Sequence, residues 1–318
     1  MKQNEFTRMR VSTCFLSASL SPEYPQMSLR ACACQHARRR GLCLILLITV
    51  ACLALLFPGC RSSKPDPFAG LVIKESKTGQ YDEIKVAPGF LLLSNMWATI
   101  DETNQKICLY EDGSYSWEWQ RGDSGVGNPN YPEVIYGVKP WGQGSDGLLL
   151  PKQLKDISSL LMELDFDYKV TNQTGWWYAT VEFFLTDEKP TPGQDIHGKT
   201  TDEIMIYFDW KGDPIGPEFK NRIENEGYSY AWTRREGNWG DAGWNYSQFS
   251  IVEKGTIPDK VDLKLFLDHI NSIYGLSNDL WLGAVEFGIM YYDQTAGWGL
   301  VKKFDLVING ERVSSGRQ

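Results

Sequence analysis

The chain of 318 residues has little cysteine in the part that we expect to fold. One cysteine, Cys108, follows residue 60, and the other six are Cys14, Cys32, Cys34, Cys43, Cys52 and Cys60. Because Cys108 has no partner within the chain if Cys60 is modified, a framework of disulfides is excluded. A zinc cluster built from cysteines is excluded for the same reason.

Histidine and positive charge are also scarce. The three histidines, His36, His197 and His269, are too few for a histidine-rich metal site, although calcium held by carboxylates stays compatible with the sequence. The net charge is −8, and residues 1–59 carry seven Lys or Arg against two Asp or Glu, so the remainder is more acidic than the whole. A nucleic-acid partner is excluded because no basic stripe exists to neutralise phosphates. We expect no metal and no cofactor.

The sequence lacks an apolar run long enough to cross a membrane. Three arginines at 38–40 precede an uncharged run from 41 to 57, which is shorter than the roughly 20 residues that a span needs. This order, followed by Pro58-Gly59-Cys60, is typical of a secretory signal with a lipoprotein-like cleavage site. We therefore expect residues 1–60 to be a signal peptide, 61–67 a short tether, and the protein to be exported and bound to the membrane only through lipid on Cys60. Plain secretion and an uncleaved anchor are the alternatives.

Residues 68–310 form one predicted domain, and 311–318 a tail. Short stretches of alternating side chains, bounded by turn residues, recur along this domain. They are Tyr81–Val86, Gly89–Ser94, Lys106–Tyr110, Tyr115–Gln120, Trp176–Leu185, Glu203–Trp210, Tyr228–Arg234, Tyr246–Glu253, Leu282–Tyr292 and Lys302–Asn309. This rhythm predicts an all-β fold of two antiparallel sheets packed face to face. We expect a monomer.

Two stretches have helical spacing instead. Between Asp262 and Gly275, apolar side chains recur every three or four residues, and the glycine is well placed to end a helix. The sequence therefore predicts one amphipathic helix there. Residues 153–164 show a shorter pattern of the same kind, which predicts a second helix.

One predicted strand, from Asp202 to Trp210, has an unusual set of side chains on one face. Because side chains alternate along a strand, one face carries Ile204, Ile206 and Phe208, and the other carries Glu203, Met205, Tyr207 and Asp209. A carboxylate beside a thioether and an aromatic ring suggests a sugar-binding cleft, and the alternative is an edge strand with a solvated glutamate. The twelve tryptophans, which all follow residue 95, favour a neutral carbohydrate partner.

Short motifs follow one another along 68–309 in a set order. They are Asn95-Met96-Trp97, Trp117-Glu118-Trp119, Tyr131-Pro132, Glu203-Ile204-Met205-Ile206-Tyr207 and Pro214-Ile215-Gly216, then the predicted helix and the last two strands. This order resembles glycoside hydrolase family 12, the small jelly-roll endo-β-1,4-glucanases and xyloglucanases. The resemblance implies an endo-acting, retaining hydrolase of a β-1,4-glucan such as cellulose, mixed-linkage glucan or xyloglucan.

The resemblance also implies roles for particular residues. Retaining glycosidases use two carboxyl groups, one as nucleophile and one as acid and then base. Glu203 matches the family's nucleophile, and Glu182 lies near the carboxylate that hydrogen-bonds to it, although a surface glutamate is the alternative for Glu182. The residues that the resemblance assigns to substrate binding are Asn95, Trp97, Trp119, Met205 and Tyr207.

The second catalytic carboxylate is where the sequence departs from the family. In Glu286-Phe287-Gly288-Ile289-Met290, a methionine occupies the family's acid/base position, and methionine transfers no proton. Glu286 shares the facing of Met290 and is the candidate for a relocated acid, with Asp293 in the next loop as another. The alternative function is a catalytically impaired surface lipoprotein that binds glucan. Without acid/base assistance, worth roughly 10²–10⁴-fold, cleavage of a natural glucan would be slow.

Overall fold

The computed structural model describes residues 66–145, 147, 149–212, 221–240 and 242–317. The predicted signal peptide 1–60, with Cys60 at its end, most of the tether 61–67, and Pro214-Ile215-Gly216 lie outside the described residues. The signal peptide, the lipid anchor and export therefore stay predictions. In the part of the chain that the structure describes, no helix has the length and the apolar character needed to cross a membrane.

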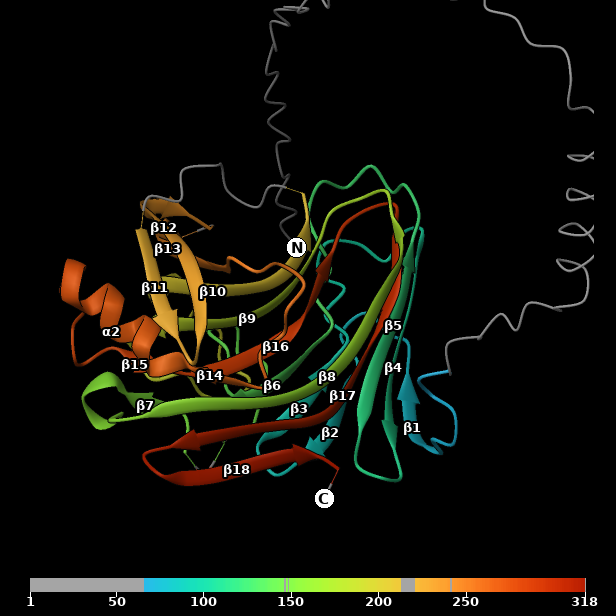
Figure 1. Cartoon of the computed structure of the whole chain (residues 1–318), viewed down its shortest axis with the longest axis horizontal. Helices are drawn as coiled ribbons and strands as arrows, with labels where there is room; N and C mark the ends of the chain where they lie inside the picture. Colours follow the sequence, from blue (N-terminus) through green and yellow to red (C-terminus); the bar gives the residue numbers. More distant parts are fainter. Residues whose placement is uncertain (1–65, 146, 148, 213–220, 241, 318) are drawn as a thin grey trace, which may run out of the picture. The chain divides into compact units, whose positions relative to one another are not determined.

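The described residues form two β-sheets that pack as layers (Figure 1). The smaller sheet has the strand order β1-β4-β5-β17-β8-β14, with β18 paired to β17. Its strands are β1 (Ile73–Lys77), β4 (Thr103–Tyr110), β5 (Tyr115–Arg121), β8 (Leu160–Gln173), β14 (Lys260–Asp262), β17 (Thr295–Ile308) and β18 (Glu311–Gly316). The tail that we expected at 311–318 is thus mostly a strand of this sheet.

The larger sheet has the order β11-β12-β13-β10-β9-β16-β6-β3-β2. The short strand β15 pairs with β9, and the short strand β7 pairs with β15. Its strands are β2 (Glu83–Ala87), β3 (Phe90–Leu93), β6 (Glu133–Gly137), β7 (Lys152–Gln153), β9 (Trp177–Thr186), β10 (Thr200–Lys211), β11 (Asn221–Asn225), β12 (Tyr228–Trp239), β13 (Trp244–Ile251), β15 (Trp281–Leu282) and β16 (Ala284–Tyr291). Within the described strands, pairing is antiparallel except between β10 and β13, which run parallel.

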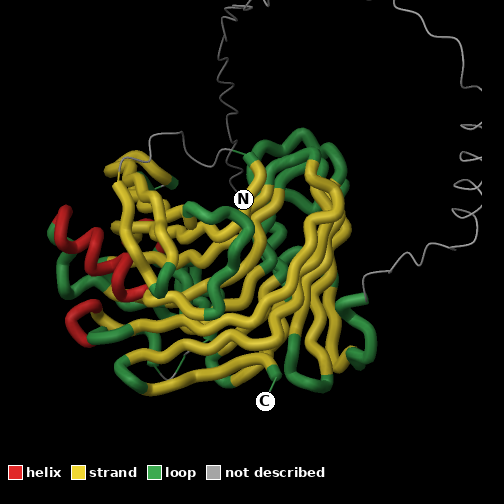
Figure 2. Tube along the Cα trace, in the orientation of Figure 1, coloured by secondary structure: helices red, strands yellow, loops and turns green. Residues whose placement is uncertain are grey.

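The main hydrophobic core fills the space between the two sheets. Phe287 of β16 meets Phe304 of β17 with ring centroids 6.2 Å apart, and Trp117 of β5 approaches Phe287 from the same side. All three side chains are fully buried, and each such burial stabilises the fold by about 1.5–3 kcal/mol. The predicted all-β sandwich is therefore confirmed, and strands dominate the chain trace (Figure 2).

The helix α2 (Leu263–Tyr274) is also confirmed. Its N-terminus is capped by the Asp262 carboxylate, which accepts hydrogen bonds from two backbone N–H groups of the first turn. Its end is set by Gly275, whose φ of 68° is left-handed and suits a residue without a Cβ. The buried stripe consists of Leu263, Phe266, Leu267 and Ile270.

The second helix, expected at 153–164, is wrong. The structure has one short 3-10 turn, η1 (Leu154–Asp156), between β7 and the long strand β8; a similar turn, η2 (His197–Lys199), precedes β10. In the first half of β8 the buried side chains are Leu160, Met162 and Leu164, which alternate with partly exposed ones, and Val170 is buried further along. Burial of every second side chain is typical of a strand with one face on the core. Packing against the core therefore favours a strand here, although the apolar residues also have helical spacing.

Cys108 lies in β4 with its side chain enclosed. Its thiol is free, and burial raises its pKa above the ordinary value for cysteine. An enclosed thiol of this kind packs as a small apolar side chain.

Candidate active site

The central strand β10 divides its side chains between two environments, as its sequence predicts, except at Asp209. A register shift after Tyr207 places Asp209 opposite Ala179, and its carboxylate accepts a hydrogen bond from Tyr168 of β8. Ile204, Ile206 and Phe208 enter the core between the sheets. Met205 and Tyr207 belong instead to a separate cluster on the other side of the larger sheet, which also contains Tyr178 of β9 and Tyr246 of β13. We call this side, where Glu203 also lies, the outer face.

The Glu203 carboxylate is enclosed on the outer face and accepts hydrogen bonds from three side chains. Its side chain is 6% exposed, and the indole Nε1 of Trp244 donates a hydrogen bond of 2.7 Å to its Oε2. Trp239 and Glu182 also donate hydrogen bonds to it. Burial raises the pKa of Glu203 to about 7, and these hydrogen bonds oppose that rise because they favour the ionised carboxylate.

Glu182, on the neighbouring strand β9, shares the enclosure of Glu203. Burial and then the charge of Glu203 raise the pKa of Glu182 well above its ordinary value. Its carboxyl group is therefore the protonated member of the pair, and it donates the hydrogen bond that Glu203 accepts. Two glutamates that share one proton in this way titrate as a unit.

The aromatic and sulfur atoms beside Glu203 form a connected set. The hydroxyl of Tyr207 lies 3.0 Å from the hydroxyl of Tyr246, and both hydroxyls reach the Met205 sulfur, at 3.3 and 3.4 Å. The Tyr178 ring tilts against the Tyr207 ring at 5.2 Å. Rings with hydroxyls at their edges offer both an apolar face and hydrogen bonds, which suits a polar ring-shaped ligand.

Met290 borders this set, because its partly buried side chain packs against the cluster of Met205 and Tyr207. On β16 it lies opposite Tyr178. The thioether therefore stands beside the aromatic residues of the outer face, at a position that offers no proton.

Glu286, the predicted relocated acid, lies four residues earlier on β16 and opposite Glu182. Its side chain is fully enclosed, and its Oε2 is 2.6 Å from the Nζ of Lys139. Burial and neighbouring carboxylates raise its pKa well above the ordinary value, against the opposing charge of Lys139. A protonated carboxyl suits an acid, although this side chain is fully enclosed beside Lys139. Its role as acid/base stays a prediction.

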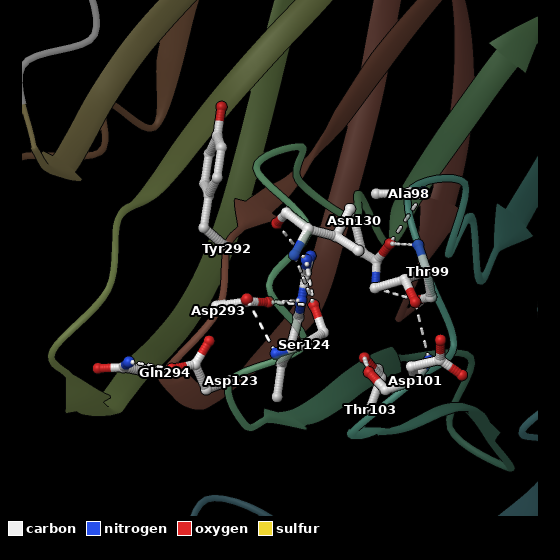
Figure 3. Close-up of polar contacts among 12 residues, drawn as sticks. Ala98, Thr99, Asp101, Thr103, Asp123, Ser124, Asn130, Tyr292, Asp293 and Gln294 are labelled. Carbon is white, nitrogen blue, oxygen red and sulfur yellow. Dashed lines mark hydrogen bonds and ion pairs between the residues drawn. The ribbon is translucent and has the colours of Figure 1, made fainter. Parts of the chain in front are cut away.

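Asp293, the other candidate for a relocated acid, is bound by an ion pair and hydrogen bonds to the loop that follows β5 (Figure 3). Its carboxylate pairs with the buried Nε of Arg121 at 2.5 Å and accepts hydrogen bonds from Ser124 and from the backbone N–H of Gly125. Although burial favours the neutral form, Ser124 and Arg121 hold the pKa of Asp293 below its usual range. It is therefore an ionised anchor and a poor proton donor. The Tyr292 ring points away from this network.

Comparison with solved structures identifies the fold. A family 12 xyloglucanase from Bacillus licheniformis, solved in complex with ligand, is 18% identical, with 74% of this chain and 100% of that chain covered and a TM-score of 0.62. Endoglucanase Cel12A from Rhodothermus marinus is 22% identical over 75% of this chain and 100% of its own, with a TM-score of 0.61. The fold is the β-jelly roll of glycoside hydrolase family 12. The xyloglucanase domain of NopAA from Sinorhizobium fredii, solved with cellobiose, is 15% identical over 75% of this chain and 100% of that domain, with a TM-score of 0.55. No protein-family model and no curated protein sequence matches the chain.

Asn95 and Trp97 lie on the loop between β3 and β4 of the jelly roll. Asn95 has a left-handed φ of 45° and donates a hydrogen bond of 2.7 Å from its amide to Glu133. The same loop is held by Asn130, whose side chain bonds to the backbone of Ala98 and Thr99 (Figure 3). Trp97 is 44% exposed on this fixed loop, so its ring is free to contact a ligand.

Trp119, predicted to bind substrate, is instead part of the jelly-roll core. It lies on β5 of the smaller sheet, is 3% exposed, and stacks on Tyr291 at 5.1 Å. Its Nε1 donates to the Thr295 hydroxyl. A ring enclosed between the sheets offers no face to a sugar, so the structure does not bring Trp119 together with Glu203.

Sequence reasoning missed Tyr178, Trp239 and Tyr246 of the candidate site, and also Trp244 and Lys139. Trp244 reaches Glu203 because β13 pairs in parallel with β10, which places Tyr246 opposite Glu203. Lys139 lies in the turn after β6 and enters the interior, where its Nζ contacts Glu133 and Glu286. The sequence feature that could have indicated its burial is a lysine inside an otherwise apolar and aromatic stretch, Val138-Lys139-Pro140-Trp141. Two surface cavities, of about 390 and 420 Å³, share no residue with this site.

Replacing Trp97 with alanine should weaken the binding of cello-oligosaccharides without loss of stability. The exposed ring supplies an apolar platform whose removal costs a contact with the sugar but leaves no cavity in the core. We expect at least about a tenfold loss of affinity for cellohexaose, measured by calorimetry. Ile100→Ala, which removes another exposed apolar side chain of the same loop, is the matched control. Unchanged affinity in a stable Trp97→Ala variant would remove Trp97 from the binding site.

Proposed function

We propose that this protein is a retaining glycoside hydrolase that acts within β-1,4-linked glucan chains, with Glu203 as the nucleophile. The observation that carries the proposal is the Glu182–Glu203 pair: an enclosed carboxylate, fixed by the Trp244 indole, beside a carboxyl that holds the shared proton. The aromatic outer face supports it, since pyranose rings stack on such side chains. The fold supports it too, because the similar solved structures include endoglucanases and xyloglucanases.

In this proposal the ionised Glu203 oxygen attacks the anomeric carbon, and the glycosidic bond breaks as the ester to Glu203 forms. Trp244 and Glu182 orient the attacking carboxylate through their hydrogen bonds. Water then hydrolyses the ester, and the anomeric configuration is retained. The proton for the leaving oxygen is assigned to Glu286, the remaining candidate on β16.

The nucleophile is tested with a dinitrophenyl fluorocellobioside, whose leaving group needs no proton and whose glycosyl ester is long-lived. Mass spectrometry of the digested protein should find the sugar on the peptide that contains Glu203. A label elsewhere, or none at all, would contradict the assignment.

The rate of this labelling should rise with pH through about 7, which is the pKa of the buried Glu203 carboxyl. Below that value the carboxyl is neutral and does not attack, so each pH unit should slow labelling by about tenfold. Stopped-flow release of dinitrophenolate from pH 5 to 9 measures this directly. A rate that stays flat across this range would mean that Glu203 does not limit the reaction.

A second candidate function is glucan binding without efficient cleavage. It is favoured by Met290 at the family's acid/base position and by the enclosure of Glu286. Under this alternative, cellohexaose binds but is not shortened over days, whereas the dinitrophenyl glycoside still labels Glu203. Chromatography of the cellohexaose reaction separates the two functions.

We also propose that the protein is exported and carries lipid on Cys60, as the signal-like residues 1–60 suggest. A Cys60→Ser variant should lose incorporation of labelled palmitate and should leave the membrane fraction. Membrane retention without lipid would instead support an uncleaved anchor.

A further inference from the structure

A buried lysine pairs with two glutamates that neighbour the Glu182–Glu203 pair. The Lys139 side chain is 7% exposed, and its Nζ is 2.9 and 3.2 Å from the two oxygens of Glu133 and 2.6 Å from Glu286. Glu286 lies directly opposite Glu182 on the neighbouring strand, and Glu182 is hydrogen-bonded to Glu203. The four carboxyl groups and the ammonium group therefore form one continuous set.

A second connection joins Lys139 to Glu203 through aromatic rings. The Lys139 Nζ lies 5.9 Å from the centre of the Trp141 ring. The Trp141 ring meets the Trp244 ring edge to face at 6.1 Å, and Trp244 donates its indole hydrogen bond to Glu203. Lys139 is thus connected through the Trp141 ring to the indole that donates to the nucleophile.

The positive charge of Lys139 opposes the effect of burial on the pKa of these carboxyl groups. Burial favours their neutral forms, whereas a nearby cation favours the ionised forms. Accordingly, Lys139 lowers the pKa of Glu203, Glu182 and Glu286 against the rise caused by burial. In return, the surrounding carboxylates keep Lys139 charged despite its own burial. The titratable and polar groups that face Glu203 are Glu182 of β9, Trp244 and Tyr246 of β13, Trp239 of β12, Tyr207 of β10 and Lys139 of the turn after β6.

We propose that Lys139 is a positioning residue for the nucleophile: its enclosed ammonium group, held between Glu133 and Glu286, keeps the Glu182–Glu203 pair at a single proton, so that Glu203 stays ionised. The inference rests on the proposed function in that Glu203 is taken as the attacking group. Lys139 itself touches no substrate in this account. It acts through charge on Glu182 and Glu203.

The first test is the pH profile of Glu203 labelling by the dinitrophenyl fluorocellobioside. In Lys139→Met, which keeps a long unbranched side chain without the charge, the midpoint should rise by at least about one pH unit. Labelling at pH 7 should then fall by about fivefold or more, while the rate above pH 9 stays close to that of the unaltered protein. Lys139→Arg, which restores the charge, should return the midpoint toward its original value.

The opposite shift is expected from the matched variant Glu133→Gln, which alters the other carboxylate that pairs with the Lys139 Nζ. This change removes a negative charge beside the same lysine, so the midpoint should fall. Glu133 has no part in the proposed reaction and the substrate's leaving group needs no acid, so the rate at high pH should stay close to that of the unaltered protein. A role of Lys139 in packing alone predicts equal slowing at every pH in both variants, and that result would overturn the proposal.

A second measurement does not depend on catalysis. In protein labelled with ¹³C at the glutamate carboxyl, NMR follows the titration of Glu203 and Glu182, assigned with Glu203→Gln and Glu182→Gln. If the unaltered protein is never labelled by the glycoside, the proposed function fails, yet a titration of Glu203 that moves up in Lys139→Met still supports the role of Lys139. If Lys139→Met does not fold, Glu133→Gln decides: a lower titration midpoint of Glu203 supports the proposal, and an unchanged midpoint overturns it.

Discussion

Replacing Glu203 with glutamine should abolish both the labelling and the cleavage of β-glucan while glucan binding persists. Glutamine keeps the shape of the side chain but removes the charge that attacks the anomeric carbon. For a group that forms the covalent intermediate, we expect activity to fall by at least about 10⁴-fold, with affinity for cellohexaose changed by less than about threefold. Reducing-sugar release and calorimetry measure the two quantities.

The matched control for this change is Glu311→Gln, at an exposed glutamate on β18 of the smaller sheet. It alters the same functional group without touching the outer face, so activity should be unchanged. Cleavage by Glu203→Gln at the rate of the unaltered protein would refute the assignment of the nucleophile. Loss of binding together with activity would show that the amide disturbs the Glu182 pair.

The other large effect concerns Met290. If no proton donor serves the leaving oxygen, Met290→Glu supplies one beside the aromatic cluster, and turnover of a natural β-glucan should rise by roughly 10²–10⁴-fold. An aryl glycoside with an acidic leaving group should gain much less, because it needs no proton. The ratio of the two rates is therefore the measurement, and Met290→Gln, polar but without an acid, is the control.

Glu286→Gln distinguishes the two sources of the proton. If Glu286 is the acid, its loss should suppress cleavage of natural glucan, and the new glutamate at 290 should add little or crowd the site with like charge. If Glu286 only pairs with the ammonium group of Lys139, Glu286→Gln should not change the cleavage of natural glucan. Insensitivity to both changes would leave Glu182 as the remaining carboxyl on the outer face, since Asp293 is fixed by Arg121.

Much of the fold could be predicted because side-chain alternation and helix caps, which are visible in the sequence, match the way that the strands and the helix pack. The alternation of Ile204, Ile206 and Phe208 with Glu203 and Met205 places each side chain on the face where the structure has it. Asp262 and Gly275 mark the two ends of α2 by cap chemistry that depends on a few residues only. Strand β8 was missed because Leu154, Ile157 and Leu161 imitate helical spacing, while the burial of alternate residues needs the core to decide it.

The site was less predictable, because it depends on contacts between distant strands. That Glu203 and Glu182 share a proton follows from their enclosure, which no local pattern reveals. A tryptophan-rich strand does not tell which face of a sandwich its rings occupy, and for this reason Trp119 was assigned to the substrate although it lies in the core. Lys139 was overlooked because a lysine in a turn is ordinarily exposed, and only the two carboxylates that surround it make its burial tolerable.

The enclosed thiol of Cys108 bears on where this domain can fold. It is the one cysteine in the part of the chain that the structure describes, so no disulfide contributes to the stability of that part. The redox potential of the surroundings then does not enter its free energy of unfolding. Burial also keeps the thiolate scarce and out of reach of oxidants. The same sandwich can therefore reach its native state in a reducing cytosol or in an oxidising compartment, without an enzyme to pair its cysteines.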